Sequence, residues 1–255
     1  MRLVEIVVPC FNEAARLDER AFLDLAGVDG VVVRFVDDGS TDGTAAVLRR
    51  LREASDSVEV TELSENRGKA EAVRLGLLDA AASGVDLVGY LDADLSTSGA
   101  EFLAMVAILR ERDDLAAVIG SRVARLGSRI DRSPLRHYSG RVFASAASVA
   151  LGVAVYDTQC GAKVFRADDH LAAAIGTPFR SPWSFDVFLL QRLLVGTSER
   201  PGLPISAFLE VPLTEWHDKP GSKVKPVAGL MALVDVLRLA WDRRARRAAG
   251  GADGP

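Results

Sequence analysis

Apolar segments of two kinds alternate along the first half of the chain. Short runs rich in Val, Ile and Leu are typical of buried strands, and longer segments with apolar residues three and four apart are typical of helices. The pattern predicts strands at 3–8, 31–36, 58–63 and 86–91 and helices at 12–26, 42–51, 67–82 and 100–110. Short strands that alternate with helices predict an α/β fold with a central, mostly parallel sheet flanked by helices.

The second half is less regular, but the same patterns predict further elements. These are strands at 118–120, just after 161 and at 207–213, and helices at 135–151, 185–194 and 226–247. The last eight residues are small and polar, so we expect a disordered tail at 248–255 after a single domain of residues 1–247.

Polar clusters follow several predicted strands at their carboxyl ends. In open α/β sheets, ligands bind beyond these ends, at the point where the strand order reverses. Several clusters that coincide there predict a ligand site at this edge of the sheet. They are Asn12-Glu13, Asp37-Asp38, Asn66-Arg67 and Asp92-Asp94.

Residues 88–94, VGYLDAD, form an apolar strand that ends in two carboxylates. Residues two apart in an extended chain point the same way, so Asp92 and Asp94 are expected to converge on one divalent cation. Mg²⁺ and Mn²⁺ prefer oxygen ligands and are usually held by one or two carboxylates together with substrate phosphates. The pattern favours an enzyme that acts on a sugar nucleotide or another diphosphate, although Asp-rich turns after strands are also common structural features.

Two of the clusters have both a structural and a functional interpretation. Asp37 and Asp38 lie in a turn before a helix, where the hydroxyl residues at 40–41 are candidate caps. Either carboxylate could also accept a hydrogen bond from a base or a ribose. In the same way, Asn12 and Glu13 are a candidate helix cap and a first-turn carboxylate, and Glu13 could equally face a nucleotide.

Composition narrows the class of protein. The chain has 49% apolar and 26% charged residues, as soluble globular proteins do, and its net charge of −4 argues against a general nucleic-acid binder. Two cysteines are too few for a disulfide framework, which favours a reducing compartment. The start of the chain has no signal-peptide pattern, and no stretch reaches the ~18 apolar residues of a membrane span. We therefore expect a cytoplasmic protein, at most peripheral at the inner face of the cytoplasmic membrane.

Two further segments carry alternatives. Six arginines between 122 and 141 precede an apolar helix, where they form either a solvated basic face or a contact for an anionic lipid phosphate. The apolar residues of the last predicted helix suit either core packing or docking at a membrane surface. His137 and Cys160 are expected to be structural, because a lone His or Cys seldom forms a metal site.

Several motifs resemble, in order and spacing, those of inverting family 2 glycosyltransferases of GT-A fold. They are residues 8–13 (VPCFNE), 36–42 (VDDGSTD), 66–70 (NRGKA) and 92–94 (DAD). The second half is similar to polyprenyl (dolichyl)-phosphate β-glucosyltransferases at 157–165 (DTQCGAKVF), 183–186 (WSFD) and 216–223 (WHDKPGSK). The resemblance covers residues 3–240.

The resemblance implies a role for each matching residue. Pro9, Glu13, Asp37 and Asp38 would line the nucleoside pocket, Lys69 would approach the donor, and Arg122 would meet a phosphate of donor or acceptor. Asp92 and Asp94 would hold Mg²⁺ or Mn²⁺, with Asp94 as the direct ligand, and Asp186 would occupy the place of a catalytic carboxylate. His217, Ser222 and Lys223 would close over the diphosphate.

The implied reaction moves glucose from a UDP-glucose donor to a polyprenyl phosphate. An acceptor phosphate is already an anion near neutral pH, whereas an acceptor hydroxyl would need a base, a role that Asp186 could fill. The sequence after the Asp pair, Leu95-Ser96-Thr97, does not fix the nucleotide. Two alternatives therefore stay open: a GDP-mannose-dependent polyprenyl-phosphate mannosyltransferase, and a soluble family 2 enzyme with a small-molecule acceptor.

Other classes fit the chain less well. A dinucleotide-binding oxidoreductase would share the strand–helix units, but residues 9–13, PCFNE, are no Gly-x-Gly-x-x-Gly turn. A sugar-nucleotide binder without activity is disfavoured by the presence of both the Asp92-Asp94 pair and Asp186.

Overall fold

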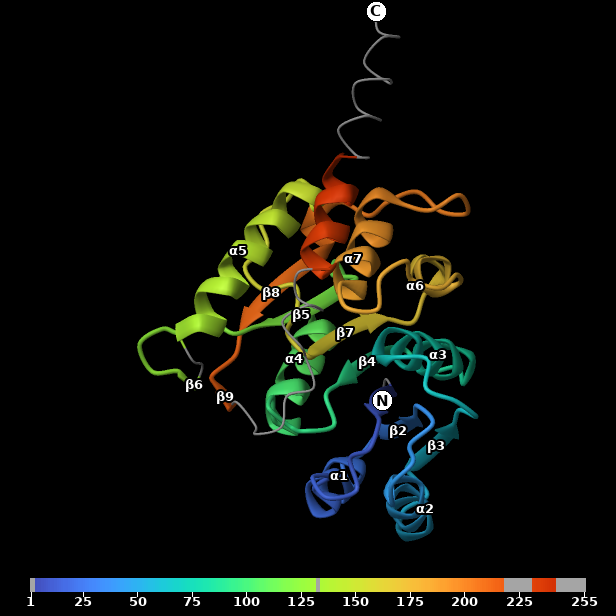
Figure 1. The fold of residues 1–255 in the computed structure, drawn as a ribbon. Coiled ribbons are helices and arrows are strands. Elements are labelled where there is room, and N and C mark those ends of the chain that lie inside the picture. The colour runs from blue at the N-terminus through green and yellow to red at the C-terminus, as the bar shows by residue number, and fades with distance from the viewer. Residues whose placement is uncertain (1–2, 132–133, 218–230, 242–255) are drawn as a thin grey trace, which may run out of the picture.

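The computed structural model describes residues 3–131, 134–217 and 231–241. At its centre lies a seven-stranded sheet with the strand order β3-β2-β1-β4-β7-β5-β8 (Figure 1). Strand β7 runs antiparallel to its neighbours β4 and β5, and the other neighbouring strands are parallel. The strands are β1 (Val4–Cys10), β2 (Val31–Asp37), β3 (Val58–Glu62), β4 (Leu87–Leu91), β5 (Ala117–Ser121), β7 (Ala162–Arg166) and β8 (Phe208–Pro212). The predicted mostly parallel sheet is confirmed.

Helices cover both faces of the sheet. Helices α1, α2 and α4 share one hydrophobic core with the sheet, and α3, α6 and α7 share a second. A third cluster joins α5, α7 and the helical residues 231–241 beside β5. The helices are α1 (Glu19–Ala26), α2 (Thr44–Ala54), α3 (Lys69–Ala82), α4 (Gly99–Glu111), α5 (Pro134–Leu151), α6 (Asp169–Ile175) and α7 (Phe185–Val195).

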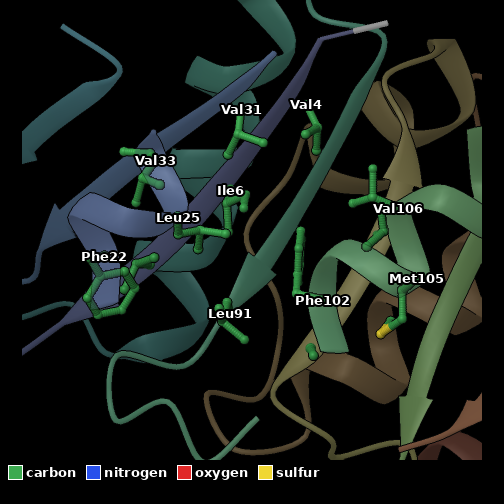
Figure 2. Close-up of a cluster of buried hydrophobic side chains, with 14 of the residues drawn as sticks. Val4, Ile6, Phe22, Leu25, Val31, Val33, Leu91, Phe102, Met105 and Val106 are labelled. Carbon is green, nitrogen blue, oxygen red and sulfur yellow. The ribbon is translucent and has the colours of Figure 1, made fainter. Parts of the chain in front are cut away.

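Strand β1 shows why the central strands are largely apolar. Successive side chains of a strand point to opposite faces of the sheet. Ile6 and Val8 belong to the first core, which also contains Phe22 of α1 and Phe102 of α4 (Figure 2). Val7, between them, belongs to the second core. A strand whose two faces are both covered therefore reads as a nearly continuous apolar run.

The first predicted helix begins later than expected. Helix α1 starts at Glu19, where Asp18 caps it by accepting a hydrogen bond from the Ala21 amide at 3.0 Å. Asn12 adopts a left-handed backbone conformation (φ 51°), and its side-chain oxygen accepts from the Thr41 amide at 2.8 Å. The interpretation of Asn12 as a helix cap and Glu13 as a first-turn residue was therefore wrong, because Asn12 joins two loops instead.

The remaining differences lie in short elements. The cap position of α2 is Gly43 rather than a hydroxyl residue at 40–41, and Asp42 accepts from the Thr44 amide at 2.9 Å. Helix α6 and the two-stranded ribbon of β6 (Arg129–Asp131) and β9 (Glu215–His217) were not predicted.

Of the helix predicted at 226–247, residues 231–241 are helical and the other positions lie outside the described residues, as does the predicted tail. Among the described helices, none is both long enough and apolar enough to cross a bilayer.

Candidate active site

The predicted polar clusters gather at one edge of the sheet. Strand β1 lies between β2 and β4, so the strand order reverses beside it, and all three strands are parallel. Cys10 at the end of β1 pairs in register with Asp37 at the end of β2. The residues that follow these strands therefore share the edge at which α/β sheets bind ligands.

Two carboxylates follow β4, beside the amino end of α3. Asp92 forms a 2.5 Å ion pair with Lys69, the first residue of α3, and its backbone amide donates to the Gly161 carbonyl at 3.0 Å. Asp94 accepts from the Ser96 amide at 2.9 Å. Between Asp94 and Ser96, Leu95 has a φ of 51°, a strained conformation for a bulky residue and one that often marks a functional turn.

Gly161 provides the space that Asp92 occupies. A Cβ atom at position 161 would lie 2.1 Å from Asp92 Oδ2, closer than any non-bonded contact allows. The Asp92 carboxylate is thus packed against the backbone that leads into β7, and it cannot move in that direction. Sequence inspection gave Gly161 no role, because the contact joins two segments about 70 residues apart.

Lys69 is the cation at the centre of this edge. Partial burial acts to lower the pKa of its ammonium group, but the carboxylates of Asp92, Asp186 and Asp94 outweigh burial and raise the pKa. Lys69 therefore carries its charge at neutral pH, with three carboxylates of the site acting on it.

Asp38 fixes the loop that leads to Lys69. Its two oxygens accept hydrogen bonds from the Arg67 amide at 2.7 Å, the Gly68 amide at 2.9 Å and the Asn66 side chain at 3.0 Å. Burial raises the pKa of Asp38, and the two backbone hydrogen bonds oppose that shift. The structure thus gives Asp38 a role in building the site, and its predicted contact with a nucleoside stays a prediction.

The other residues predicted to line a nucleoside pocket lie at the ends of β1 and β2. Asp37 is buried and accepts from the Ser40 amide at 3.1 Å. Glu13 is also buried, and both of its oxygens accept from the Arg16 guanidinium, at 2.7 and 2.9 Å. Pro9 is half-buried in β1.

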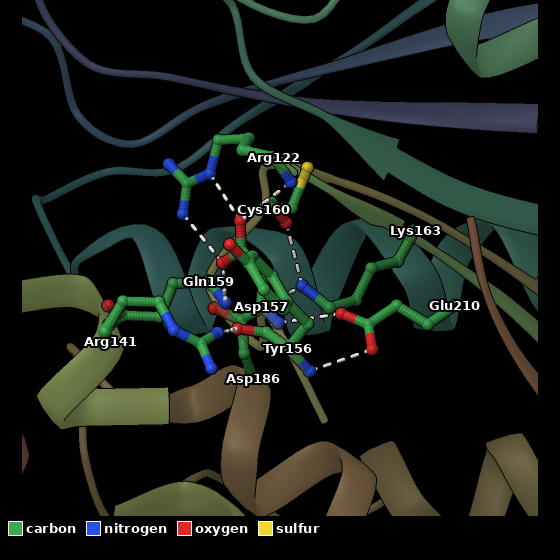
Figure 3. A network of polar contacts seen from close by, with 9 residues as sticks. All are labelled: Arg122, Arg141, Tyr156, Asp157, Gln159, Cys160, Lys163, Asp186 and Glu210. Carbon is green, nitrogen blue, oxygen red and sulfur yellow. Dashed lines mark hydrogen bonds and ion pairs between the residues drawn. The ribbon is translucent and has the colours of Figure 1, made fainter. Parts of the chain in front are cut away.

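Asp186 lies in the first turn of α7 and is buried. Its Oδ1 accepts from Lys163 Nζ at 2.7 Å and from the Tyr90 hydroxyl (Figure 3 shows Asp186 and Lys163). Sequence reasoning missed both donors. A lysine inside the apolar run of β7 was the available signal, since a buried ammonium needs a carboxylate beside it.

Arg122 is held by a carboxylate that the sequence analysis did not assign to the site. Its guanidinium forms two hydrogen bonds to Asp157, at 2.6 and 2.8 Å (Figure 3). Burial acts to lower the pKa of Arg122, but Asp157 outweighs burial and raises it, so Arg122 stays charged. Glu210 of β8 fixes this turn by accepting from the Tyr156 and Asp157 amides at 2.8 and 2.7 Å.

The predicted residues at the chain's last motif are described in part. His217 contacts Asp131 at 2.9 Å, and its amide donates to the Ser96 carbonyl at 3.1 Å, which places it beside the turn that carries Asp94. Ser222 and Lys223 lie outside the described residues. In the arginine segment, Arg129 pairs with Glu215 at 3.3 Å and Arg141 donates to the Tyr156 carbonyl at 3.0 Å. Arg122, Arg129 and Arg141 therefore have partners inside the protein.

The donor set suits a hard divalent cation. Asp92 and Asp94 supply two carboxylates, and Asp92 is 31% exposed, so both protein and ligand can reach it. Within the described residues, no group of three or more His, Cys, Asp or Glu side chains forms a complete metal site. Two carboxylates completed by substrate phosphates are the usual arrangement for Mg²⁺. With Lys69 beside them, the edge can hold a diphosphate and neutralise its charge.

Sequence comparison identifies a matching family and several relatives. Residues 5–171 match the family model described as Glycosyl transferase family 2. The dolichyl-phosphate beta-glucosyltransferase of Drosophila melanogaster is 32% identical over 94% of this chain and 74% of its own length. The enzyme of the same name from Dictyostelium discoideum is 28% identical over 92% of this chain and 73% of its own.

Solved structures confirm the fold. Glucosyl-3-phosphoglycerate synthase from Mycobacterium tuberculosis, crystallised with Mn²⁺, UDP-glucose and glycerol 3-phosphate, superimposes with a TM-score of 0.64. The match covers 95% of this chain and 80% of that one at 21% identity. The predicted GT-A architecture is therefore confirmed.

Proposed function

Because this chain belongs to glycosyltransferase family 2, we propose that it transfers glucose from UDP-glucose to a polyprenyl phosphate, with inversion at the anomeric carbon and with Mg²⁺ or Mn²⁺ as cofactor. Glycosyl transfer itself follows from the family. The donor, the acceptor and the metal are the proposed part. The observation that carries them is the ion pair between Lys69 and Asp92, with Asp94 two residues further on, at the carboxyl ends of the neighbouring strands β1 and β4.

The side chains at this edge suit the departure of a nucleoside diphosphate. Asp92 and Asp94 would hold the divalent ion, which supplies positive charge to the leaving diphosphate. The Lys69 ammonium adds a second positive charge, which its carboxylate neighbours keep in place. Pro9, Glu13 and Asp37 would border the nucleoside, because they lie at or just after the carboxyl ends of β1 and β2, the next two strands after β4 on this side of the sheet.

An anionic acceptor suits the opposite side of the site. Arg122 and Asp157 lie beyond β5 and β7, on the far side of Asp92 from the nucleoside strands. An acceptor phosphate would approach Arg122, whose charge compensates that of the incoming anion. His217 stands at the turn that carries Asp94, where it would contact a phosphate group.

A lipid acceptor is supported by an apolar surface. Val149 of α5 and Leu237 and Trp241 of the last helix are exposed and line one shallow pocket, so these two helices lie side by side (Figure 1). Exposed apolar side chains on neighbouring helices are typical of proteins that contact membranes or other apolar partners. We therefore include peripheral contact with a membrane in the proposal.

Purified protein tested with combinations of donor, acceptor and metal distinguishes the proposed substrates from the alternatives. The donors are UDP-glucose and GDP-mannose, and the acceptors are a short polyprenyl phosphate, 3-phosphoglycerate and the matching polyprenol without phosphate. Each pair is assayed with Mn²⁺, with Mg²⁺ and with a chelator. We expect product only from UDP-glucose and polyprenyl phosphate, and only with metal.

Each other outcome overturns one part of the proposal. If only GDP-mannose is turned over, the proposed donor is wrong. If only 3-phosphoglycerate accepts the sugar, the proposed lipid acceptor is wrong. Equal turnover with and without the chelator would show that the reaction needs no metal. Product from the unphosphorylated polyprenol would show that the site activates a hydroxyl.

A further inference from the structure

The buried contact between Tyr90, Lys163 and Asp186 lies behind the proposed donor edge. Tyr90 of β4 and Lys163 of β7 face each other directly in the antiparallel pairing of the two strands. Lys163 Nζ lies 5.2 Å from the centre of the Tyr90 ring, so both side chains reach the same face of the sheet. There they meet Asp186 of α7.

This contact buries a full ion pair. The Lys163 side chain is 0% exposed and the Asp186 side chain 8%. Within the described residues, Asp186 is the only ion-pair partner of Lys163. Removing one partner of such a pair leaves an uncompensated buried charge, so the two charges depend on each other.

Both hydrogen bonds to Asp186 fall on a single oxygen. Lys163 and Tyr90 both donate to Oδ1, whereas Oδ2 accepts from no residue in the described part of the chain. An ionised carboxylate can only accept hydrogen bonds, so the Tyr90 hydroxyl is the donor in this contact. These two hydrogen bonds hold the Asp186 carboxylate in one orientation, with Oδ1 directed at Tyr90 and Lys163.

Lys163 also connects Asp186 to the backbone that holds Asp92. Its ammonium donates to the Cys160 carbonyl at 2.8 Å. The carbonyl of the next residue, Gly161, accepts a hydrogen bond from the Asp92 amide at 3.0 Å. The Gly161 backbone also leaves no room for the Asp92 carboxylate to move toward it.

We propose that Tyr90 and Lys163 are positioning residues of the transfer reaction, which fix Asp186 as a stationary anion and, through the Cys160-Gly161 backbone, hold Asp92 in place. This inference rests on the proposed function of the same site. It assigns roles to two side chains that touch neither the predicted metal nor the predicted diphosphate. Their loss should slow the reaction more than it weakens donor binding.

Tyr90→Phe tests this inference with little change in packing, because the ring is kept and one hydroxyl is lost. We expect kcat to fall about tenfold, the effect of one hydrogen bond to a charged group, with KM for the donor changed less than about twofold. Ser83→Ala is the matched control. Ser83 likewise donates to a buried carboxylate that is paired with a cation, Glu5 with Arg34, but at the other end of the sheet. Its kcat should equal that of the wild type.

Lys163→Met alone leaves a buried carboxylate and is expected to unfold easily, so it is compared with Lys163→Met/Asp186→Asn. The double variant has no buried charge at this place. We expect it to recover the wild-type melting temperature while kcat stays at least about 100-fold lower. A kcat within twofold of the wild type in Tyr90→Phe or in the double variant would overturn the inference.

The assay uses whichever nucleotide sugar the wild-type protein turns over. If that sugar is not UDP-glucose, the proposed donor is wrong, but the ratio of variant to wild type still decides the positioning role. The two proposals can therefore fail separately.

Discussion

At the scale of single residues, Asp94 carries the sharpest prediction. Asp94→Ala removes one of two carboxylates that would hold the metal, while its hydrogen bond to the Ser96 amide is local. We expect transfer to fall by about 1,000-fold or more, a typical result of losing a metal ligand, with the melting temperature nearly unchanged. Steady-state assays and thermal melts measure both quantities. Asp86→Ala, an exposed carboxylate just before the same strand, is the control. Near-normal transfer by Asp94→Ala would contradict the metal assignment.

Gly161 makes a second prediction at this scale. In Gly161→Ala the added methyl group must displace the Asp92 carboxylate, which lies 2.1 Å from the Cβ position. Transfer should fall at least about tenfold, because small misplacements at an active site are costly. Gly27→Ala adds the same group where the nearest atom is 3.4 Å away, and it should keep full activity. Equal activity of the two variants would show that Asp92 does not depend on this packing.

At the scale of elements, the entry of the chain into α3 depends on Asp38. Asp38→Ala would leave the Arg67 and Gly68 amides without their acceptor. Each lost hydrogen bond to a charged group is worth about 1.5–3 kcal/mol, so we expect the loss of two to lower the free energy of unfolding by about 3–6 kcal/mol. Lys69 would lose its place, and transfer should fall with it. Urea unfolding measures the first effect. A variant that keeps stability but loses transfer would instead point to contact with the nucleoside.

The helices and strands also show which parts of the fold could be predicted from the sequence. Strands β1 to β4 and helices α2 to α4 were found because apolar periodicity is a local property. The start of α1 was missed because Asn12 makes its contact with Thr41, in another loop. The antiparallel direction of β7 was also not predicted, because the sequence of one strand does not show which strands it will pair with.

Residues of the candidate site divide in the same way. Asp92, Asp94 and Lys69 stand in recognisable motifs, and the structure pairs Lys69 with Asp92. Tyr90, Lys163 and Asp157 act through partners far away in the chain. A tyrosine in a buried strand usually serves core packing, so the sequence gave no reason to select Tyr90.

For the whole molecule, two buried groups link stability to pH. Burial raises the pKa of the Cys160 thiol from 9.0 to about 11, and that of Tyr90 is also raised. The folded state holds these protons more tightly than the unfolded state, so the stabilisation is complete below pH 9 and is lost as pH rises through 11. Urea unfolding from pH 8 to 11 should show this decline. Cys160→Ala should reduce the decline by about 2 kcal/mol. An unchanged decline would mean that Cys160 ionises as freely in the folded protein.

The apolar surface of α5 and residues 231–241 gives a prediction for membrane contact. Leu237→Ser/Trp241→Ser removes two exposed apolar side chains, so binding to vesicles of anionic lipid should weaken about tenfold. Co-sedimentation measures it. Ile205→Ser, equally exposed but before β8, is the control and should bind like the wild type. Transfer to a short, detergent-free acceptor should stay unchanged in both variants. Equal vesicle binding by all three proteins would remove this surface from the proposal.

The position of β7 has a consequence for how the protein is made. Strand β4 ends at Leu91 and its partner β7 begins at Ala162. About 70 residues are therefore synthesised while one edge of β4 has no partner strand. At ribosomal speeds of ~5–20 residues per second, that interval lasts about 4–14 seconds. An unpaired apolar strand edge is an aggregation hazard. Strand β5 also waits, because β7 is its link to the rest of the sheet. Slower translation between β4 and β7 should therefore lower the yield of soluble protein, and chaperones that bind nascent chains should restore it.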